Sequence, residues 1–115
     1  MHGKLIVIYP ERTTETVEYD EPIPLKILQG AVGGYIELVP MFTTYGERNG
    51  PRERCVAFCD EDGKLKDLPV NFLAQALWQD AIFYRPDGSL VMAMTDVLVG
   101  PIAIVTGDDE FMAEL

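Results

Sequence analysis

The sequence predicts an α+β domain with a largely antiparallel sheet of about five to seven strands and two or three short helices packed on one face. Short apolar runs rich in β-branched residues recur along the chain, turn signals separate them, and two segments have apolar residues at helical spacing. The chain has 115 residues, of which 48% are hydrophobic and 24% are charged. This size and composition are typical of a chain that folds as one domain, which we expect over residues 1–115.

The chain begins with a pattern typical of a β-hairpin. Leu5–Tyr9 is a continuous apolar run, which indicates a buried strand. Thr13–Tyr19 mixes β-forming residues with acids, so we expect a second strand that pairs with the first through a turn near Pro10–Arg12.

A helix is predicted next, because apolar residues recur at helical spacing over Leu25–Val32. Asp20–Pro22 would supply its cap, an acid and an early proline. Gly33 or Gly34 would end the helix in the left-handed conformation, which only glycine adopts without steric cost. A buried strand over residues 35–42 is expected to follow.

The middle of the chain predicts a loop and then a hairpin. Thr43–Arg54 has no apolar period and two turn signals, which favours an exposed loop or a mobile hairpin tip. Cys55–Cys59 is strand-like, and the turn residues Asp60–Gly63 would bring Lys64 and Leu65 back as its partner strand.

A second helix is predicted after Asn71, which is placed as its N-cap. Ala81–Tyr84 and Leu90–Met94 flank a proline-aspartate-glycine turn, so we expect a further hairpin there. The alternative is that residues 74–84 continue as helix.

The C-terminal segment predicts a strand and a short helix. Val97–Val105 is the most apolar segment, and Pro101 cannot donate to a sheet, so this strand is expected to be bulged or to lie at an edge. Asp108–Glu110 would begin a terminal helix, since acids suit the positive end of a helix dipole.

Charge and cysteine content narrow the range of functions. The formal charge of −10 disfavours direct binding to nucleic acid and favours a basic protein surface as partner, although acids also keep small proteins soluble. Membrane binding is not expected, because no apolar run approaches the roughly 20 residues that span a bilayer. Cys55 and Cys59 lie too far apart on one strand to bridge, which favours reduced thiols and a cytoplasmic location. A homodimer remains an open alternative.

The residue inventory argues against common enzyme classes. His2 is the only histidine and Ser89 the only serine, which leaves no internal Ser-His or Cys-His pair. The glycines at 33 and 34 follow a helix and precede a strand, which is the reverse of a phosphate-binding loop. Cys55 and Cys59 lack enough partners for a zinc site. We therefore predict no catalytic residue, no metal and no cofactor.

Three short blocks in a fixed order carry a family resemblance. They are Val32-Gly33-Gly34-Tyr35-Ile36-Glu37, then Asp62-Gly63-Lys64-Leu65 with Leu68, Pro69 and Asn71, and then Asp96-Val97-Leu98-Val99-Gly100 leading into Ile102–Gly107. Together they resemble the domain-of-unknown-function family 3846, small proteins of bacteriophages, plasmids and other mobile elements. The resemblance implies an accessory protein of mobile DNA and no particular reaction.

Six residues of these blocks are candidates for binding a ligand: Gly33, Gly34, Tyr35, Glu37, Asn71 and Asp96. Each has a plain structural alternative, such as a solvent-facing Glu37, a helix-capping Asn71 or a turn-closing Asp96. The first hypothesis is a non-enzymatic module that binds a host or phage protein. The second is a small-ligand-binding domain or carboxylate-based enzyme with a pocket near the Gly33-Gly34 joint.

Overall fold

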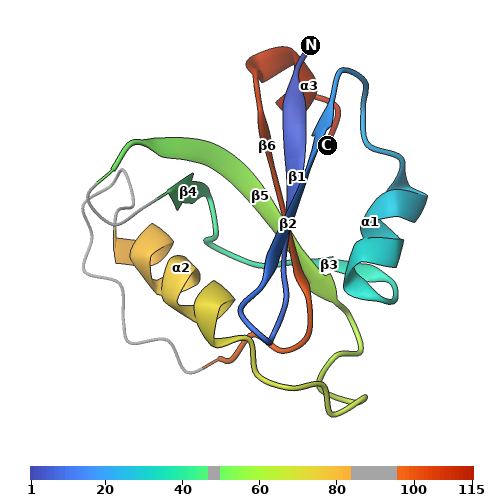
Figure 1. Cartoon of the computed structure of the whole chain (residues 1–115), viewed down its shortest axis with the longest axis vertical. Coiled ribbons are helices and arrows are strands. Elements are labelled where there is room, and N and C mark those ends of the chain that lie inside the picture. The colour runs from blue at the N-terminus through green and yellow to red at the C-terminus, as the bar shows by residue number, and fades with distance from the viewer. Residues whose placement is uncertain (47–49, 84–95) are drawn as a thin grey trace.

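The structure, a computed structural model, describes residues 1–46, 50–83 and 96–115 (Figure 1). It is an α+β fold with an antiparallel sheet, which confirms the predicted class. The elements in these ranges are β1 (Gly3–Ile8), β2 (Thr14–Tyr19), α1 (Leu25–Val32), β3 (Ile36–Leu38), β4 (Thr44–Gly46), β5 (Arg52–Asp60), α2 (Phe72–Phe83), β6 (Ile102–Gly107) and α3 (Asp109–Met112). The strands follow the order β2-β1-β6-β5-β3, and β4 also pairs with β5.

The two central strands, β1 and β6, are buried on both faces of the sheet. They pair antiparallel in register, with Ile6 opposite Ile104 and Leu5 opposite Val105. Side chains on a strand alternate between the two faces. A continuous apolar run therefore supplies apolar side chains to both faces at once.

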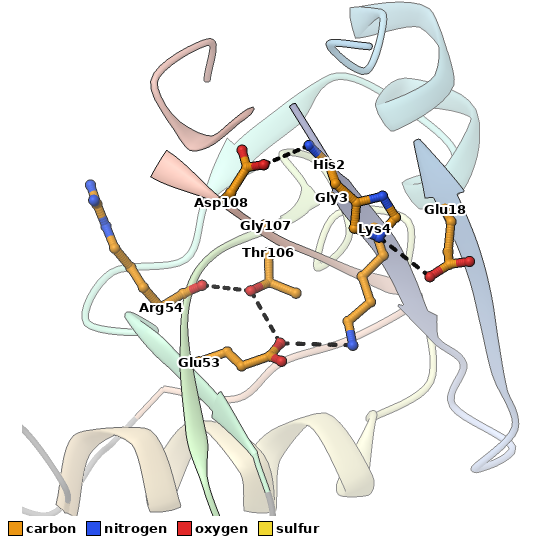
Figure 2. Close-up of a pocket in the computed structure, with 9 residues that line it drawn as sticks. All are labelled: His2, Gly3, Lys4, Glu18, Glu53, Arg54, Thr106, Gly107 and Asp108. Carbon is orange, nitrogen blue, oxygen red and sulfur yellow. Dashed lines mark hydrogen bonds and ion pairs between the residues drawn. The ribbon is translucent and has the colours of Figure 1, made fainter. Parts of the chain in front are cut away.

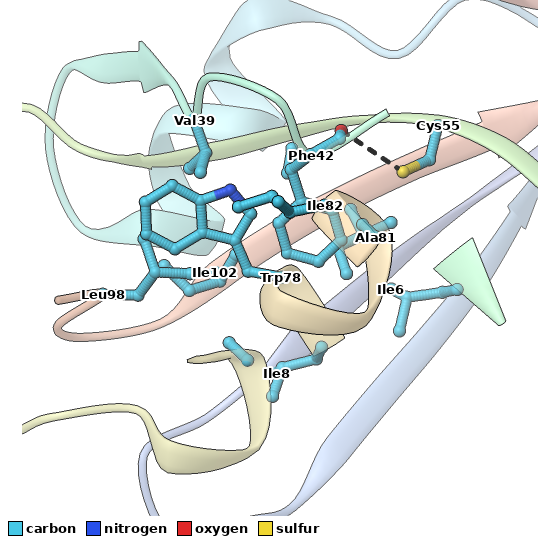
Figure 3. Packing of buried hydrophobic residues seen from close by; sticks show 13 residues of the cluster. Ile6, Ile8, Val39, Phe42, Cys55, Trp78, Ala81, Ile82, Leu98 and Ile102 are labelled. Atoms are coloured by element: carbon cyan, nitrogen blue, oxygen red, sulfur yellow. Dashed lines mark hydrogen bonds between the residues drawn. The ribbon is translucent and has the colours of Figure 1, made fainter. Parts of the chain in front are cut away.

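Helices cover both faces of the sheet, so the expectation that they pack on one face is wrong. Ile6 and Ile8 contact the core that contains α2, whereas Leu5 and Val7 contact the core that contains α1 and α3. Figure 1 shows α1 and α2 on opposite sides of the central strands. Figure 3 shows the α2 core, in which Trp78 packs among aliphatic side chains.

Helix α1 ends where the sequence predicts but begins differently. Gly33 has a φ of 87° and donates its N–H to the Gln29 carbonyl at 2.8 Å, which confirms a left-handed helix end. The expected cap in Asp20–Pro22 is wrong, because the helix starts after Pro24 and no side chain caps it. The fixed φ of proline suits that position.

The strand after the glycine pair lies at an edge of the sheet and is not buried. Among the described strands, β3 pairs only with β5. Leu38 on this strand is 58% exposed, and Tyr35, just before the strand, is 70% exposed. The buried apolar residues of this segment, Val39 and Phe42, lie beyond the end of the strand.

The segment Thr43–Arg54, which was expected to be a loop, contains paired β-strands. β4 and the first residues of β5 pair antiparallel, with Tyr45 opposite Glu53. Arg52 supports this pairing, since its Nε donates to the Thr44 hydroxyl at 3.0 Å. Residues 47–49 of the segment expected to be an exposed loop or a hairpin tip lie outside the described residues.

The hairpin predicted after β5 is wrong, because residues 61–67 form a series of turns. The Asp60 carboxylate accepts the Asp62 N–H at 2.9 Å, and the Gly63 N–H bonds to the Asp60 carbonyl at 3.0 Å. The Lys66 ammonium donates to the Asp60 carboxylate at 2.7 Å. A buried carboxylate that organises local turns competes with strand pairing.

Asn71 caps α2 as predicted and also connects three segments. Its Oδ1 accepts the Ala74 N–H at 3.1 Å, and its Nδ2 donates to the carbonyls of Ile8 and Gly100 at 2.8 and 2.9 Å. Its backbone N–H donates to the Leu98 carbonyl at 2.9 Å. The side chain is fully buried, so these bonds form where water cannot replace them.

The hairpin predicted from Ala81 is wrong at its start, because α2 continues to Phe83. The helical alternative is therefore right as far as that residue. The remaining residues of the predicted hairpin, 84–95, lie outside the described residues.

The proline near the C-terminus precedes its strand. β6 begins at Ile102, directly after Pro101, so the expected bulge or edge position is wrong and β6 lies between β1 and β5. Gly100 has a φ of 71° and donates to the Pro69 carbonyl at 2.8 Å, which turns the chain into the strand.

The terminal helix α3 confirms the predicted acidic start. Asp108 caps it by accepting the Phe111 N–H at 2.9 Å. The Phe111 ring packs on the paired glycines Gly3 and Gly107, where an added Cβ would lie 2.2 and 2.6 Å from ring atoms. These glycines therefore let the helix lie close to the sheet.

Replacement of Asn71 should destabilise the fold strongly. Asn71→Ala removes the cap and leaves two buried carbonyls without a donor, so the free energy of unfolding should fall by about 2–4 kcal/mol. Asn71→Ser keeps a capping oxygen and should recover roughly 1 kcal/mol of that loss. Urea unfolding of the three chains measures this, and equal stability of the alanine variant and the parent would contradict the role of these bonds.

Candidate binding pocket at the sheet edge

Two of the cavities on the described surface are each lined by at least five charged side chains. The larger, about 580 Å³, lies at the start of β1 (Figure 2). Its charges are paired with one another: Lys4 lies 3.7 Å from Glu53, and His2 lies 3.5 Å from Glu18. The Arg54 side chain points away from the others drawn in Figure 2. This cavity therefore offers few free charges to a ligand.

The smaller cavity, about 150 Å³, lies at the β3 edge of the sheet, and we call it the edge pocket. Segments far apart in the sequence meet there: β3 and the residues after it, the end of β5 with its turns, α2, and the segment before β6. The lining residues are Glu37, Leu38, Val39, Pro40, Cys59, Asp60, Glu61, Lys64, Leu65, Trp78, Asp96, Val97, Leu98 and Val99.

Buried apolar residues on the inner side of the edge pocket hold its shape. Val39, Trp78 and Leu98 belong to the α2 core (Figure 3). The Trp78 indole N–H donates to the Pro40 carbonyl at 2.8 Å, which fixes the ring against the residues after β3. Because Trp78 is only 2% exposed, it forms a rigid wall of the pocket.

Gln75 on α2 holds the segment that carries Asp96. Its side-chain amide donates to the Asp96 carbonyl at 3.1 Å and accepts the Leu98 N–H at 2.8 Å. The segment before β6 is therefore fixed to α2 by two bonds from one side chain.

Acidic side chains and exposed apolar side chains share the rim. Among the described residues that line the pocket are four carboxylates, those of Glu37, Asp60, Glu61 and Asp96, and one cation, Lys64. Among the described residues, no hydrogen bond or ion pair of the Glu37 or Glu61 carboxylate is found. Leu65 on the same rim is 87% exposed, and Leu38, which also lines the pocket, is 58% exposed.

The two aspartates of the edge pocket are held in the ionised form. The Lys64 ammonium bonds to the Asp96 carboxylate and, with the Val97 N–H at 2.8 Å, lowers the pKa of Asp96. Burial by itself would raise the pKa of Asp60, but the bonds from Lys66 and the Asp62 N–H outweigh it and lower that pKa. Neither aspartate is therefore suited to donate a proton near neutral pH.

The Cys59 thiol in the edge pocket is held in the neutral form. Burial, followed by the nearby carboxylates of Glu37, Asp60 and Asp96, raises its pKa to about 11. Only a thiolate is an effective nucleophile. The described lining of the pocket therefore combines negative charge and apolar surface with an unactivated thiol, which is an arrangement suited to binding.

The structure brings together two of the six residues predicted to bind a ligand. Glu37 and Asp96 line the edge pocket, whereas Asn71 is buried and uses its side chain for structural bonds. Gly34 and Tyr35 line a separate surface depression with residues 29, 62 and 66.

Each glycine of the joint has a structural role. Gly33 ends α1, as described above. Gly34 lies beside the Asp60–Lys66 pair, where an added Cβ would come within 2.8 Å of the Asp60 carboxylate and 2.9 Å of the Lys66 ammonium. Absence of a side chain at Gly34 therefore lets this ion pair form against the backbone.

Four further lining residues, Cys59, Glu61, Lys64 and Trp78, were not predicted from the sequence as part of a site. Lys64 belongs to the second block of the family resemblance, which was the available signal for it. The role of Trp78 could not be predicted from the sequence, since the same helical spacing suits a core residue and a residue of a binding surface.

Among the described residues, no cluster of histidine, cysteine and carboxylate side chains is arranged to hold a metal ion. No helix in the described ranges is long and apolar enough to span a membrane.

The fold and its edge pocket define a small α+β domain with an acidic, partly apolar cavity. The chain belongs to the family described as Domain of unknown function (DUF3846), which matches residues 1–114. Searches of curated proteins and of solved structures found no match.

Thiol labelling tests the electrostatics of the pocket. Because the pKa of Cys59 is about 11 and that of Cys55 about 12, the native chain should react with iodoacetamide at least about tenfold more slowly at about pH 8 than the urea-unfolded chain. The rate at Cys59 should rise steadily with pH up to about 11. Mass spectrometry of the labelled peptides distinguishes the two residues, and a rate that levels off near about pH 8.5 would contradict a raised pKa.

The same pKa shift predicts a loss of stability in base. A thiol whose pKa is raised in the folded state holds its proton more tightly there than in the unfolded chain. The contribution of Cys59 to stability should be constant below its ordinary pKa of 9.0 and fall as the pH rises towards about 11. Cys59→Ala should reduce this dependence in urea unfolding at several pH values, and an unchanged slope would contradict it.

Proposed function

We propose that this protein is a non-enzymatic interaction module that binds a basic surface of another protein through the edge pocket. The observation that carries the proposal is the combination at one sheet edge of exposed apolar side chains with carboxylates that have few partners among the described residues. Leu38 and Leu65 are 58% and 87% exposed beside Glu37 and Glu61. Exposed apolar surface surrounded by polar groups is typical of a protein-binding site.

The overall charge supports a basic partner. A formal charge of −10 attracts cationic surfaces over a distance and repels a second copy of the same chain. A homodimer through the edge pocket would bring like charges together, which makes it the weaker alternative. In the mobile-element context that the family resemblance implies, the partner would be a protein of a phage or of its bacterial host, in the cytoplasm.

A second candidate function is the binding of a small ligand without a partner protein. The cavity of about 150 Å³ that contains Glu37 and Asp96 favours it, since convergent polar groups on an apolar wall are typical of ligand sites. A carboxylate-based reaction receives less support, because the lowered pKa of Asp96 makes its carboxylate a weak base and a poor proton donor, and the neighbouring Cys59 thiol is protonated.

Paired charge variants test the protein-binding proposal. The double variant Glu37→Gln with Glu61→Gln removes two rim carboxylates, and Glu21→Gln with Glu114→Gln removes two exposed carboxylates outside the pocket. A tagged chain would be used to capture partners from lysates of phage-infected bacteria, and the affinity of each purified partner would then be measured. The rim variant should lose about tenfold in affinity and the control variant less than about twofold.

A salt titration and an apolar variant complete this test. Raising the salt from about 50 mM to about 500 mM should weaken binding by the parent more than binding by the rim variant. Leu65→Ser should also reduce affinity, because the partner would cover this side chain. Equal effects of the two charge variants would show a general charge effect and reject the edge pocket as the binding surface.

A further inference from the structure

A cation of the chain itself already lies in the edge pocket. The Lys64 ammonium bonds to the Asp96 carboxylate, and the side chains of the two residues are 60% and 57% exposed. Ion pairs with this much solvent contact contribute little to stability. The ion pair between Lys64 and Asp96 can therefore be broken at a small cost in free energy when another cation binds to Asp96.

The pocket has more negative charge than Lys64 can neutralise. Glu37 and Glu61 line the same cavity without a cationic partner among the described residues, and Lys66 is committed to Asp60 at 2.7 Å. An incoming cation would therefore meet Asp96 together with additional carboxylates on the rim.

The inner wall suits a hydrocarbon stem. Val39, Trp78 and Leu98 form an apolar wall, and the neutral Cys59 thiol adds no charge to it. Lysine and arginine side chains bury their apolar stems along such surfaces while the charged end stays near carboxylates and water. A volume of about 150 Å³ matches a single side chain better than a larger metabolite.

We propose that the edge pocket binds one basic side chain of the partner, a lysine or an arginine, and that Lys64 is an internal competitor for the same carboxylate. This inference rests on the proposed function and specifies what the partner inserts. Binding would transfer the Asp96 carboxylate from the Lys64 ammonium to the ammonium or guanidinium of the partner. Lys64 would then swing into solvent and raise the selectivity for partners that offer several contacts.

Small capped amino acids provide the direct test on the full chain. The probes are the Nα-acetyl amides of arginine, lysine and citrulline, of which citrulline is close in shape to arginine but uncharged. Binding is followed by the fluorescence of Trp78, the only tryptophan, and by the amide signals of Cys59 and Val97 in NMR spectra. The arginine and lysine probes should saturate, and their relative affinities show which side chain the pocket prefers. Citrulline should bind at least about tenfold more weakly, since a charge-assisted bond is lost.

Variants of Lys64 test the competition. Lys64→Met removes the ammonium and keeps a stem of similar length, so probe affinity should rise at least about threefold. Lys64→Arg keeps the competing charge and should leave affinity near that of the parent. Lys26→Met on α1 makes the same change of net charge away from the pocket and serves as the matched control.

Asp96→Asn completes a double-mutant cycle with Lys64→Met. It should weaken probe binding about tenfold, and Lys64→Met should then have little effect, because no carboxylate remains to compete for. NMR spectra of each variant show whether the fold is intact. Equal binding of citrulline and arginine, or no gain in affinity from Lys64→Met, would overturn the inference.

The two proposals fail in different ways. If the probes bind as expected but the rim variant captures the partner normally, the cation site is supported and the proposed protein-binding surface is rejected. If the rim variant loses the partner but the charged probes do not bind, the protein-binding surface is supported and the insertion of a basic side chain is rejected.

Discussion

The buried side chain of Asn71 is the connection on which the rest of the structure depends. It joins the end of β1, the turn before β6 and the first turn of α2 through the carbonyls of Ile8 and Gly100 and the N–H of Ala74. α2 in turn places Trp78 against the residues that follow β3, and so builds the wall of the edge pocket. A residue that sequence reasoning selected for ligand binding thus acts on the pocket only indirectly, by fixing the helix that lines it.

The chemistry of the edge pocket follows from where its charges are neutralised. The buried Asp60 carboxylate accepts hydrogen bonds from the Lys66 ammonium and from a backbone N–H, which offset the cost of burying its charge. Glu37 and Glu61, in contrast, are exposed at the rim. An acidic chain with few cations leaves some carboxylates unmatched, and the fold gathers two of them beside exposed leucines. This arrangement favours recognition of a basic group over a reaction, because the pKa values of Asp60 and Asp96 are lowered and that of the Cys59 thiol is raised.

The errors of the sequence analysis share one physical cause, which is that local patterns do not report what lies across the sheet. An apolar run such as Leu5–Ile8 has the same sequence pattern whether helices cover one face of the sheet or both. Only the packing in the structure shows that its side chains enter two separate cores, one with α2 and one with α1 and α3. The segment after Asp60 contains ordinary hairpin residues, but a carboxylate that binds Lys66 and the Asp62 N–H favours successive turns instead. Pro101 was read as a flaw within a strand, although a proline also marks the start of one.

The sequence by itself determined the α+β class, the C-terminal end of α1, the start of α3, the cap of α2, the acidic charge and the family. Those features depend on neighbours within a few residues or on composition, which a linear pattern contains. Only the tertiary structure decided that helices cover both faces, that Gly34 adjoins an ion pair, and that Glu37 and Asp96 meet across 59 positions of sequence at one cavity. Such meetings depend on strand order and on side-chain packing between distant segments, for which the chain carries no local signal.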